Sequence, residues 1–295
     1  KKAGADEDAL ACGPHAPMHL PAAEALKAQG REPTRIHNNC SGKHAGLLAL
    51  AAHHRWPRDG YHLLLCTHFE SINRALYRNA AYKLEDIAPI SQISRYYYAI
   101  ALTNEVPAQN WDTFIGYAKA NPAKLNYASV GNGSSSQLTM ELLKAAAGID
   151  VVHVPFNGSP PAVMATVQGD TQMLFAVMQP LQAQIQAGRL RALAMTSVKR
   201  FPLLPDIPTI ADAGYPGFEA LAWNGILVSA GTPRPIIQRL NTEINAILKE
   251  PLVKSALNAQ GFDLIGGTPE DFAKLIRSES EKWAPVIRKT GVRID

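Results

Sequence analysis

The chain has 295 residues, enough for two compact units that each bury a hydrophobic core. Lys and Arg total 29 against 25 Asp and Glu, which gives a net charge of only +4. No block of like charge accompanies this balance, so it argues against a nucleic-acid-binding or polybasic membrane surface. The longest uncharged windows, 151–169 and 171–188, carry three prolines and five glutamines respectively, so neither predicts a membrane span.

The composition changes close to residue 60. All three cysteines and eight of the nine histidines lie within the first 68 residues. The odd number of cysteines argues against a complete disulfide framework. Lys1 and Lys2 are followed by acidic residues instead of an apolar segment, so we expect no signal peptide within the chain. Either a signal peptide was removed before residue 1, which would make the protein periplasmic, or there was none and the compartment is unknown.

From residue 61 onward, short apolar runs alternate with amphipathic segments, which is typical of an α/β protein. A capping residue, Asn110, precedes the first predicted helix, and Gly148 ends the second. Strands are predicted at 61–67, 97–102, 125–129, 151–155, 172–177, 190–196 and 223–229, and helices at 111–120, 137–147, 162–168, 180–187, 235–248 and 269–290.

Two glycine–serine loops lie between a predicted strand and a predicted helix. The first contains Gly131, Asn132, Gly133, Ser134, Ser135 and Ser136, and the second contains Asn157, Gly158 and Ser159. Glycines let the backbone approach a ligand, and a helix N-terminus offers unpaired N–H groups that suit a carboxylate or phosphate. Plain helix capping by the serines is the alternative for either loop alone. Because parallel strands end at one edge of a sheet, the pair predicts a ligand site at that edge.

Catalytic motifs are missing from residues 61–295. The segment has no G-x-S-x-G, P-loop, G-x-G-x-x-G or H-E-x-x-H pattern. His153 is the only histidine after residue 68, and its place inside an apolar strand favours packing over ligand binding. We therefore predict a binding protein with no cofactor and no catalytic residues.

Two long segments carry a resemblance to a known family. LNYASVGNGSSSQLTMELLKAAAGIDVVHVPFNGSPPAVMATVQGD and RLRALAMTSVKRFPLLPDIPTIADAGYPGFEALAWNGILVSAGTP resemble the Bug-type solute-binding receptors of tripartite tricarboxylate transporters. The resemblance runs from about residue 59 to residue 295. It implies a two-lobed, flytrap-like periplasmic-binding-protein fold, with lobe 1 at 61–103 and 223–295 and lobe 2 at 104–222.

The resemblance also implies function and partners. Such a receptor captures a small organic carboxylate and delivers it to membrane transporter subunits, and we expect a monomer that binds no nucleic acid. By position, Thr67, His68 and Ser71 fall in a further binding loop, and Trp223 and Asn224 stand at the return crossing between lobes. Amino-acid-binding relatives carry an aspartate after the central Phe, whereas Phe175 is followed here by Ala176. A ligand without an amine is therefore predicted.

Residues 9–62 resemble a different family. The run NNCSGKHAG at 38–46 is similar to an internal piece of type II asparaginases, a resemblance that makes Cys40 and Lys43 neighbours of an active site or a metal. Cys12 and His15 could complete a zinc site with them, which we do not favour. The serine–lysine catalytic elements of that family are absent. We therefore expect a lobe 1 without its usual N-terminal strands and a receptor impaired in binding; the alternatives are an asparaginase-like amidohydrolase fragment or a nonfunctional fusion product.

Overall fold

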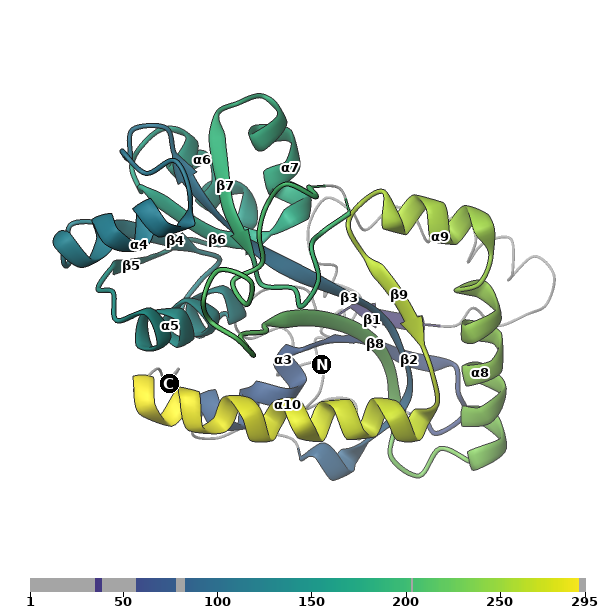
Figure 1. The fold of residues 1–295 in the computed structure, drawn as a ribbon. Coiled ribbons are helices and arrows are strands. Elements are labelled where there is room, and N and C mark those ends of the chain that lie inside the picture. The colour runs from purple at the N-terminus through teal and green to yellow at the C-terminus, as the bar shows by residue number, and fades with distance from the viewer. Residues whose placement is uncertain (1–34, 39–56, 78–82, 203, 292–295) are drawn as a thin grey trace, which may run out of the picture.

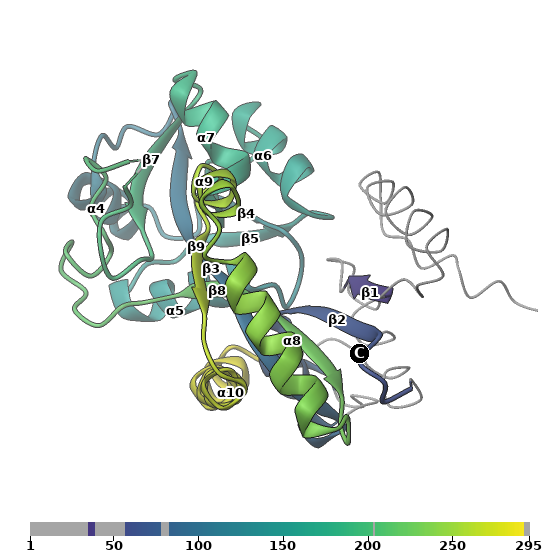
Figure 2. The same ribbon diagram turned by 90° about the vertical axis from the view of Figure 1, so that its right-hand side faces the viewer.

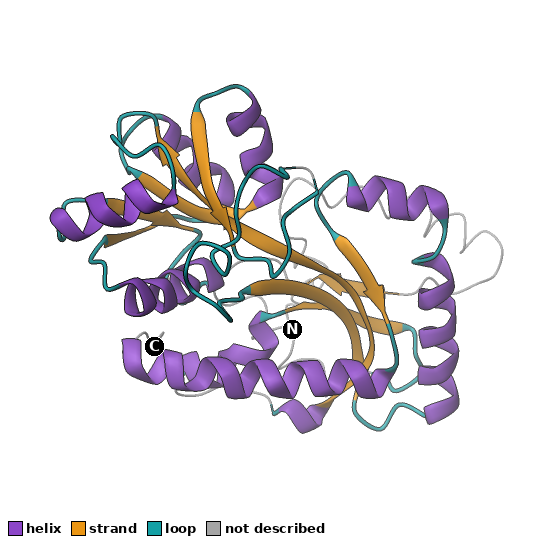
Figure 3. Ribbon diagram, viewed as in Figure 1, coloured by secondary structure: helices purple, strands orange, loops and turns teal. Residues whose placement is uncertain are grey.

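The computed structural model describes residues 35–38, 57–77, 83–202 and 204–291. Within this part of the chain, helices and strands form two α/β halves that share one long strand (Figure 1, Figure 3). The predicted α/β class is therefore confirmed. None of the described helices is long and apolar enough to cross a membrane.

The shared strand is β3 (Ile87–Thr103). Up to Tyr97 it pairs antiparallel with β8 (Leu221–Ser229), and part of the same stretch pairs with β9 (Asp263–Gly266). From Tyr98 onward its partner is β6 (Met173–Val177), with β7 (Leu190–Met195) on the other side. The sequence predicted only 97–102, because Pro89 and several polar residues break the apolar pattern before it. The strand register shifts next to Pro89, which lacks the N–H that a regular ladder needs.

The half that contains the N-terminal part of β3 has the strand order β1-β2-β8-β3. β2 (His62–Thr67) runs antiparallel to β8, and β1 (Arg35–Asn38) runs parallel to β2. We expected no strand before residue 61, and β1 supplies one at this edge. The helical segments of this half are α3 (Phe69–Leu76), η3 (Leu84–Asp86), α8 (Arg234–Ile247), α9 (Pro251–Asn258) and α10 (Pro269–Thr290).

The other half continues from β3 through β6, β4 (Asn126–Ser129) and β5 (Val152–Pro155). Its helices are α4 (Trp111–Ala120), α5 (Ser135–Ala147), α6 (Ser159–Val167) and α7 (Met178–Gln186). Alternate residues of β3 enter two different hydrophobic clusters, Ile100 with Phe114 and Ala101 with Val163. The sheet is thus covered on both faces, which explains the continuous apolar runs of β6 and of the C-terminal part of β3.

Helix α10 contacts both halves. It packs against α3 and β3 and also reaches α5, and Figure 1 shows it running below α5 and β8. Figure 2 shows α8 alongside the sheet of β3 and β8. The apolar face of α10 consists of Phe272, Ile276, Trp283 and Ile287, spaced for one side of a helix. The sequence predicted this helix and α8 closely, but it missed α3, α9 and β9, which are eight residues long or shorter.

Candidate functional site

Three strands end at one edge of the second half, and each is followed by a helix. β4 runs parallel to β5 on one side and to β6 on the other. Helices α5, α6 and α7 begin where these strands end. Since each helix N-terminus carries unpaired N–H groups and partial positive charge, this edge favours an anion. It is the edge that the glycine–serine loops predicted.

Serine hydroxyls hold the loop between β4 and α5 in shape. Ser134 is the N-cap of α5, and its Oγ accepts the Gln137 N–H at 3.3 Å and donates to the Gly131 carbonyl at 2.6 Å. Ser136 Oγ accepts the Val130 N–H at 3.2 Å. Gly131 has a φ of 138°, a conformation that favours glycine. The hydroxyls of Ser134 and Ser136 thus cap the helix and close the loop, which is the alternative to ligand binding given above.

The third serine of this loop is tied to the core. The Ser135 hydroxyl is hydrogen-bonded to the Tyr98 phenol, and burial raises the pKa of Tyr98, so the phenol stays protonated. By contrast, the backbone N–H groups of Ser135 and Ser136 have no acceptor among the described residues. These N–H groups are therefore what the loop can offer to an anion.

His153 supports the same loop from β5. Its Nε2 lies 2.6 Å from Ser129 Oγ, and Ser129 Oγ also donates to the Gly131 carbonyl at 3.1 Å. The imidazole stacks on Tyr127 with ring centroids 4.9 Å apart. These contacts agree with the prediction that His153 is a packing residue.

The loop between β5 and α6 brings two polar side chains without hydrogen-bond partners to this edge. The Gly158 N–H donates to the Val130 carbonyl at 3.3 Å, which ties the second loop to the first. The Asn157 side chain is exposed, and neither it nor the Ser159 hydroxyl has a hydrogen-bond partner among the described residues. Asn132 is likewise exposed in the first loop. Side-chain donors at this edge thus come from the second loop more than from the first.

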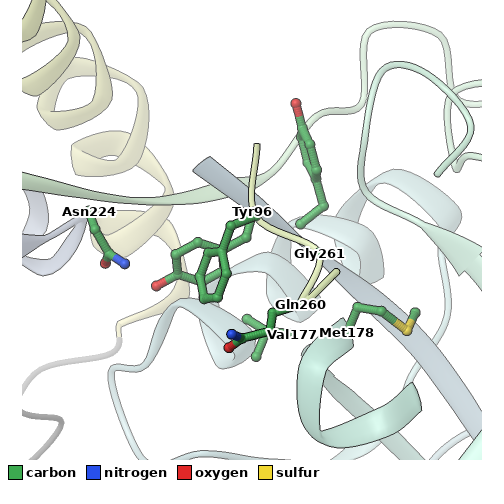
Figure 4. A pocket seen from close by; sticks show the side chains of 8 residues that line it. Tyr96, Val177, Met178, Asn224, Gln260 and Gly261 are labelled. Atoms are coloured by element: carbon green, nitrogen blue, oxygen red, sulfur yellow. The ribbon is translucent and has the colours of Figure 1, made fainter. Parts of the chain in front are cut away.

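A cavity of about 150 Å³ lies at the N-terminus of α7 (Figure 4). Figure 4 shows the Tyr96 hydroxyl and the Asn224 amide facing one another at one end, with Met178 at the other. Residues from β3, β6, α7, β8 and the α9–β9 connection line it: Tyr96, Tyr97, Val177, Met178, Asn224, Gln260, Gly261 and Phe262. None of these residues is charged.

The Thr67–Ser71 turn, which connects β2 to α3, is a buried polar segment. The Thr67 N–H and hydroxyl both point at Glu70 Oε2, at 2.7 Å and 3.4 Å, and Ser71 Oγ donates to the His68 carbonyl at 2.6 Å. Burial raises the pKa of Glu70 to about 8. Burial and the Glu70 charge together raise the pKa of Tyr96, so this turn and the cavity share an electrostatic environment.

Two buried rings carry nitrogens without partners where this turn meets β8. His68 is 6% exposed, its backbone N–H donates to the Trp223 carbonyl at 3.1 Å, and burial lowers its pKa to about 3. Neither ring nitrogen of His68, nor Trp223 Nε1, has a partner among the described residues. The Trp223 ring is fully buried and packs edge-on against Phe272. Of the two residues predicted at the return crossing, Asn224 lines the cavity and Trp223 packs inside.

Sequence reasoning missed most of the cavity lining. The run of three tyrosines at 96–98 was a usable signal, because aromatic residues next to a predicted crossing are suited to ligand contact. Gln260, Gly261 and Phe262 carry no local signal, since only tertiary structure brings the α9–β9 connection against β3. Cys12, His15, Cys40 and Lys43 lie outside the described residues, and within the described part no cluster of His, Cys, Asp and Glu could hold a metal ion.

Comparison with known proteins gives a family match that begins nearer the N-terminus than the sequence motifs indicated. Residues 21–292 match the model for the tripartite tricarboxylate transporter family receptor. Over 266 residues the chain is 30% identical to BugT of Bordetella pertussis, covering 89% of this chain and 81% of BugT. The family match thus begins at residue 21, earlier than the residue 59 that the motifs indicated, and it includes most of residues 9–62, the segment that was predicted to resemble asparaginase.

Solved structures confirm the predicted two-lobed architecture of periplasmic binding proteins. Rpa4515 from R. palustris with adipate has a TM-score of 0.80 and 30% identity, covering 93% of this chain and 92% of that one. The periplasmic binding protein BugD has a TM-score of 0.77 and 27% identity, covering 92% and 91%. MatC from Rhodopseudomonas palustris with bound malate has a TM-score of 0.75 and 27% identity, covering 90% and 91%.

Proposed function

Because this chain belongs to the receptor family of tripartite tricarboxylate transporters, we propose that it captures a small organic carboxylate for such a transporter. The convergence of three helix N-termini on one sheet edge, beside a cavity, carries the proposal. A carboxylate held there accepts charge-assisted hydrogen bonds from backbone N–H groups and needs no lysine or arginine. Two similar receptors were solved with adipate and malate, both of them dicarboxylates. The family is one of transport receptors, not of enzymes.

We propose that the carboxylate lies between the two halves. On one wall the free donors are the N–H groups of Ser135 and Ser136 and the side chains of Asn157 and Ser159. On the other wall, Asn224 and the Thr67–Ser71 turn supply the contacts. The predicted ligand-binding set, Thr67, His68, Ser71, Gly131–Ser136, Asn157–Ser159, Trp223 and Asn224, is proposed to form this site. Trp223 and the hydroxyls of Ser134 and Ser136 support it from within.

The ligand is proposed to lack an ammonium group. Ala176, which follows the central Phe175, is buried in the sheet opposite Ala99. No acidic side chain lines the cavity. Glu70 is the carboxyl group whose charge reaches Tyr96, and burial raises its pKa to about 8, so it is mostly protonated at neutral pH. An ammonium group would find no counter-charge in this cavity.

The lobes are proposed to be 61–103 with 223–295, and 104–222, with β3 and the chain before β8 as the crossings. Closure of these lobes around the ligand would present the receptor to the membrane subunits of the transporter. We expect it to act in the periplasm, where its structural relatives are described, and as a monomer.

An impaired receptor and an asparaginase-like fragment stay as predictions for the N-terminal part. Strand β1 at 35–38 and the family match from residue 21 favour a receptor wall over a foreign segment there. Sub-micromolar carboxylate binding would contradict the impaired reading. Ammonia release from asparagine, abolished by Cys40→Ala or Lys43→Ala, would instead support the amidohydrolase.

Isothermal titration calorimetry with mono-, di- and tricarboxylates tests the proposal. We expect at least one class to bind and Asn157→Ala to weaken that binding about tenfold, the effect of one lost hydrogen bond to a charged ligand. Asn258→Ala, at an exposed position that ends α9, is the matched control and should leave the affinity unchanged. Absence of binding by every class would reject the proposed function.

A further inference from the structure

The cavity at the N-terminus of α7 is neutral throughout. Val177, Met178 and Phe262 give it apolar surface, and the amides of Asn224 and Gln260 are polar but uncharged. Among the described residues, the Arg95 guanidinium contacts the lining, with its Cζ 5.9 Å from the Tyr97 ring centroid. Arg95 Nε is already paired with Asp263 at 3.4 Å, so its charge is compensated.

This cavity adjoins the edge where the helix N-termini meet. Val177 ends β6, the strand next to β4, and the first loop follows β4 directly. Tyr96 lines the cavity, and Tyr98, two residues along β3, is hydrogen-bonded to Ser135 at the start of α5. A ligand whose carboxylate occupies the helix ends can therefore extend its other end into the cavity.

From this arrangement, and resting on the proposed function, we propose that the ligand is a monocarboxylate with an apolar or aromatic tail. A cavity of about 150 Å³ is large enough for a group the size of benzene. A second carboxylate in the same place would lose its hydration and gain no cation. The tail instead replaces water against Val177, Met178 and Phe262, and each buried methylene is expected to strengthen binding about fourfold.

Adipate and hexanoate provide a matched test, because they have the same chain length and differ in one terminal carboxylate. Calorimetric titration of the full chain should show hexanoate binding at least about tenfold more tightly than adipate. Equal or tighter binding of adipate would overturn the inference and leave the proposed function standing. If neither of these acids nor any other carboxylate binds, the proposed function itself fails.

Variants that place a cation in the cavity test whether the apolar tail of the ligand lies there. Met178→Lys should reverse the order, so that adipate binds more tightly than hexanoate. Gln260→Arg should shift the ratio in the same direction, and this exposed position tolerates substitution if the buried Met178 does not. Met164→Lys, on the exposed face of α6, is the control for added charge and should preserve the hexanoate preference. An unchanged preference in both cavity variants would overturn the inference.

Discussion

The β4–α5 loop (130–134) and the Thr67–Ser71 turn are both strand-to-helix connections at which hydrogen-bond donors were predicted. They differ in whether their polar side chains have hydrogen-bond partners. In the β4–α5 loop the hydroxyls of Ser134, Ser135 and Ser136 all have partners, and the backbone N–H groups of Ser135 and Ser136 and the exposed Asn132 side chain are left over. In the Thr67–Ser71 turn, both ring nitrogens of His68 are buried without partners, and Glu70 is buried as a carboxyl group.

The β4–α5 loop is therefore held in shape before ligand binds, whereas the Thr67–Ser71 turn contains buried groups whose protonation changes with pH. A hydrogen-bonded loop keeps its donors in place before the ligand arrives, which lowers the entropy that binding must overcome. Buried ionisable groups make the free energy of unfolding depend on pH instead. We therefore expect substitutions in the two segments to differ in both size and pH dependence.

The largest expected effect is that of Glu70→Gln. Burial raises the folded-state pKa of Glu70 from 4.5 to about 8, so the folded protein holds this proton more tightly than the unfolded chain does. The resulting stability is fully present below pH 4.5 and is lost as the pH rises through 8. Glutamine mimics the protonated acid at every pH, so Glu70→Gln should match the wild type near pH 4.5 and exceed it by roughly 4 kcal/mol above pH 8.

Urea unfolding at a series of pH values measures this difference. Glu243→Gln, at an exposed position on α8, is the control and should show no such pH dependence relative to the wild type. A Glu70→Gln profile parallel to that of the wild type would mean that the carboxyl group is not buried as a titrating group.

A smaller effect is expected from Ser134→Ala in the β4–α5 loop. The substitution removes the N-cap of α5 and the bond that closes the loop on the Gly131 carbonyl. The free energy of unfolding should fall by about 1–2 kcal/mol, independent of pH between 5 and 9. Ser159→Ala, where the hydroxyl has no partner among the described residues, should change stability by less than about 0.5 kcal/mol and still weaken ligand binding. Equal loss of stability in the two variants would remove the distinction between the loops.

The hydrogen bond between Tyr98 and Ser135 should be worth about 1 kcal/mol. Tyr98→Phe and Ser135→Ala should each lower the free energy of unfolding by that amount, and the double variant should cost little more than either one. Thermal or urea unfolding of the four proteins in a double-mutant cycle measures the coupling. Strictly additive losses would show that the two hydroxyls do not bond to one another.

These features differ in how far sequence predicts them. The glycine–serine loops were placed correctly between a strand and a helix, because Gly131 and the serines specify such a turn through local backbone chemistry; the ligand site at that edge stays a prediction. The same residues could not show that the Ser135 hydroxyl is taken by Tyr98, 37 positions earlier. The first half of β3 was missed at Pro89, and the contribution of Gln260 to the cavity depends on tertiary packing alone. Local chemistry thus predicted where donors gather, and long-range contacts decide which of them are free.

A small effect on stability at pH 7 is expected from His68→Leu. A buried imidazole without partners contributes no hydrogen bond to the fold, so leucine of similar volume should change the free energy of unfolding at pH 7 by less than about 1 kcal/mol. Burial lowers the folded-state pKa of His68 from 6.5 to about 3, so stability present above pH 6.5 is lost as the pH falls toward 3. His68→Leu should therefore become more stable than the wild type near pH 4.

Ligand-binding measurements distinguish a role of the His68 imidazole in recognition from a role in packing. If His68 donates to the carboxylate, His68→Leu should weaken binding at least about tenfold at pH 7 while the unfolding curve there stays unchanged. Phe69→Leu, at the neighbouring half-buried ring that stacks on His68, is the packing control and should keep the affinity. Unchanged affinity in His68→Leu would assign the Thr67–Ser71 turn to the fold and leave ligand recognition to Asn224 and the two loops.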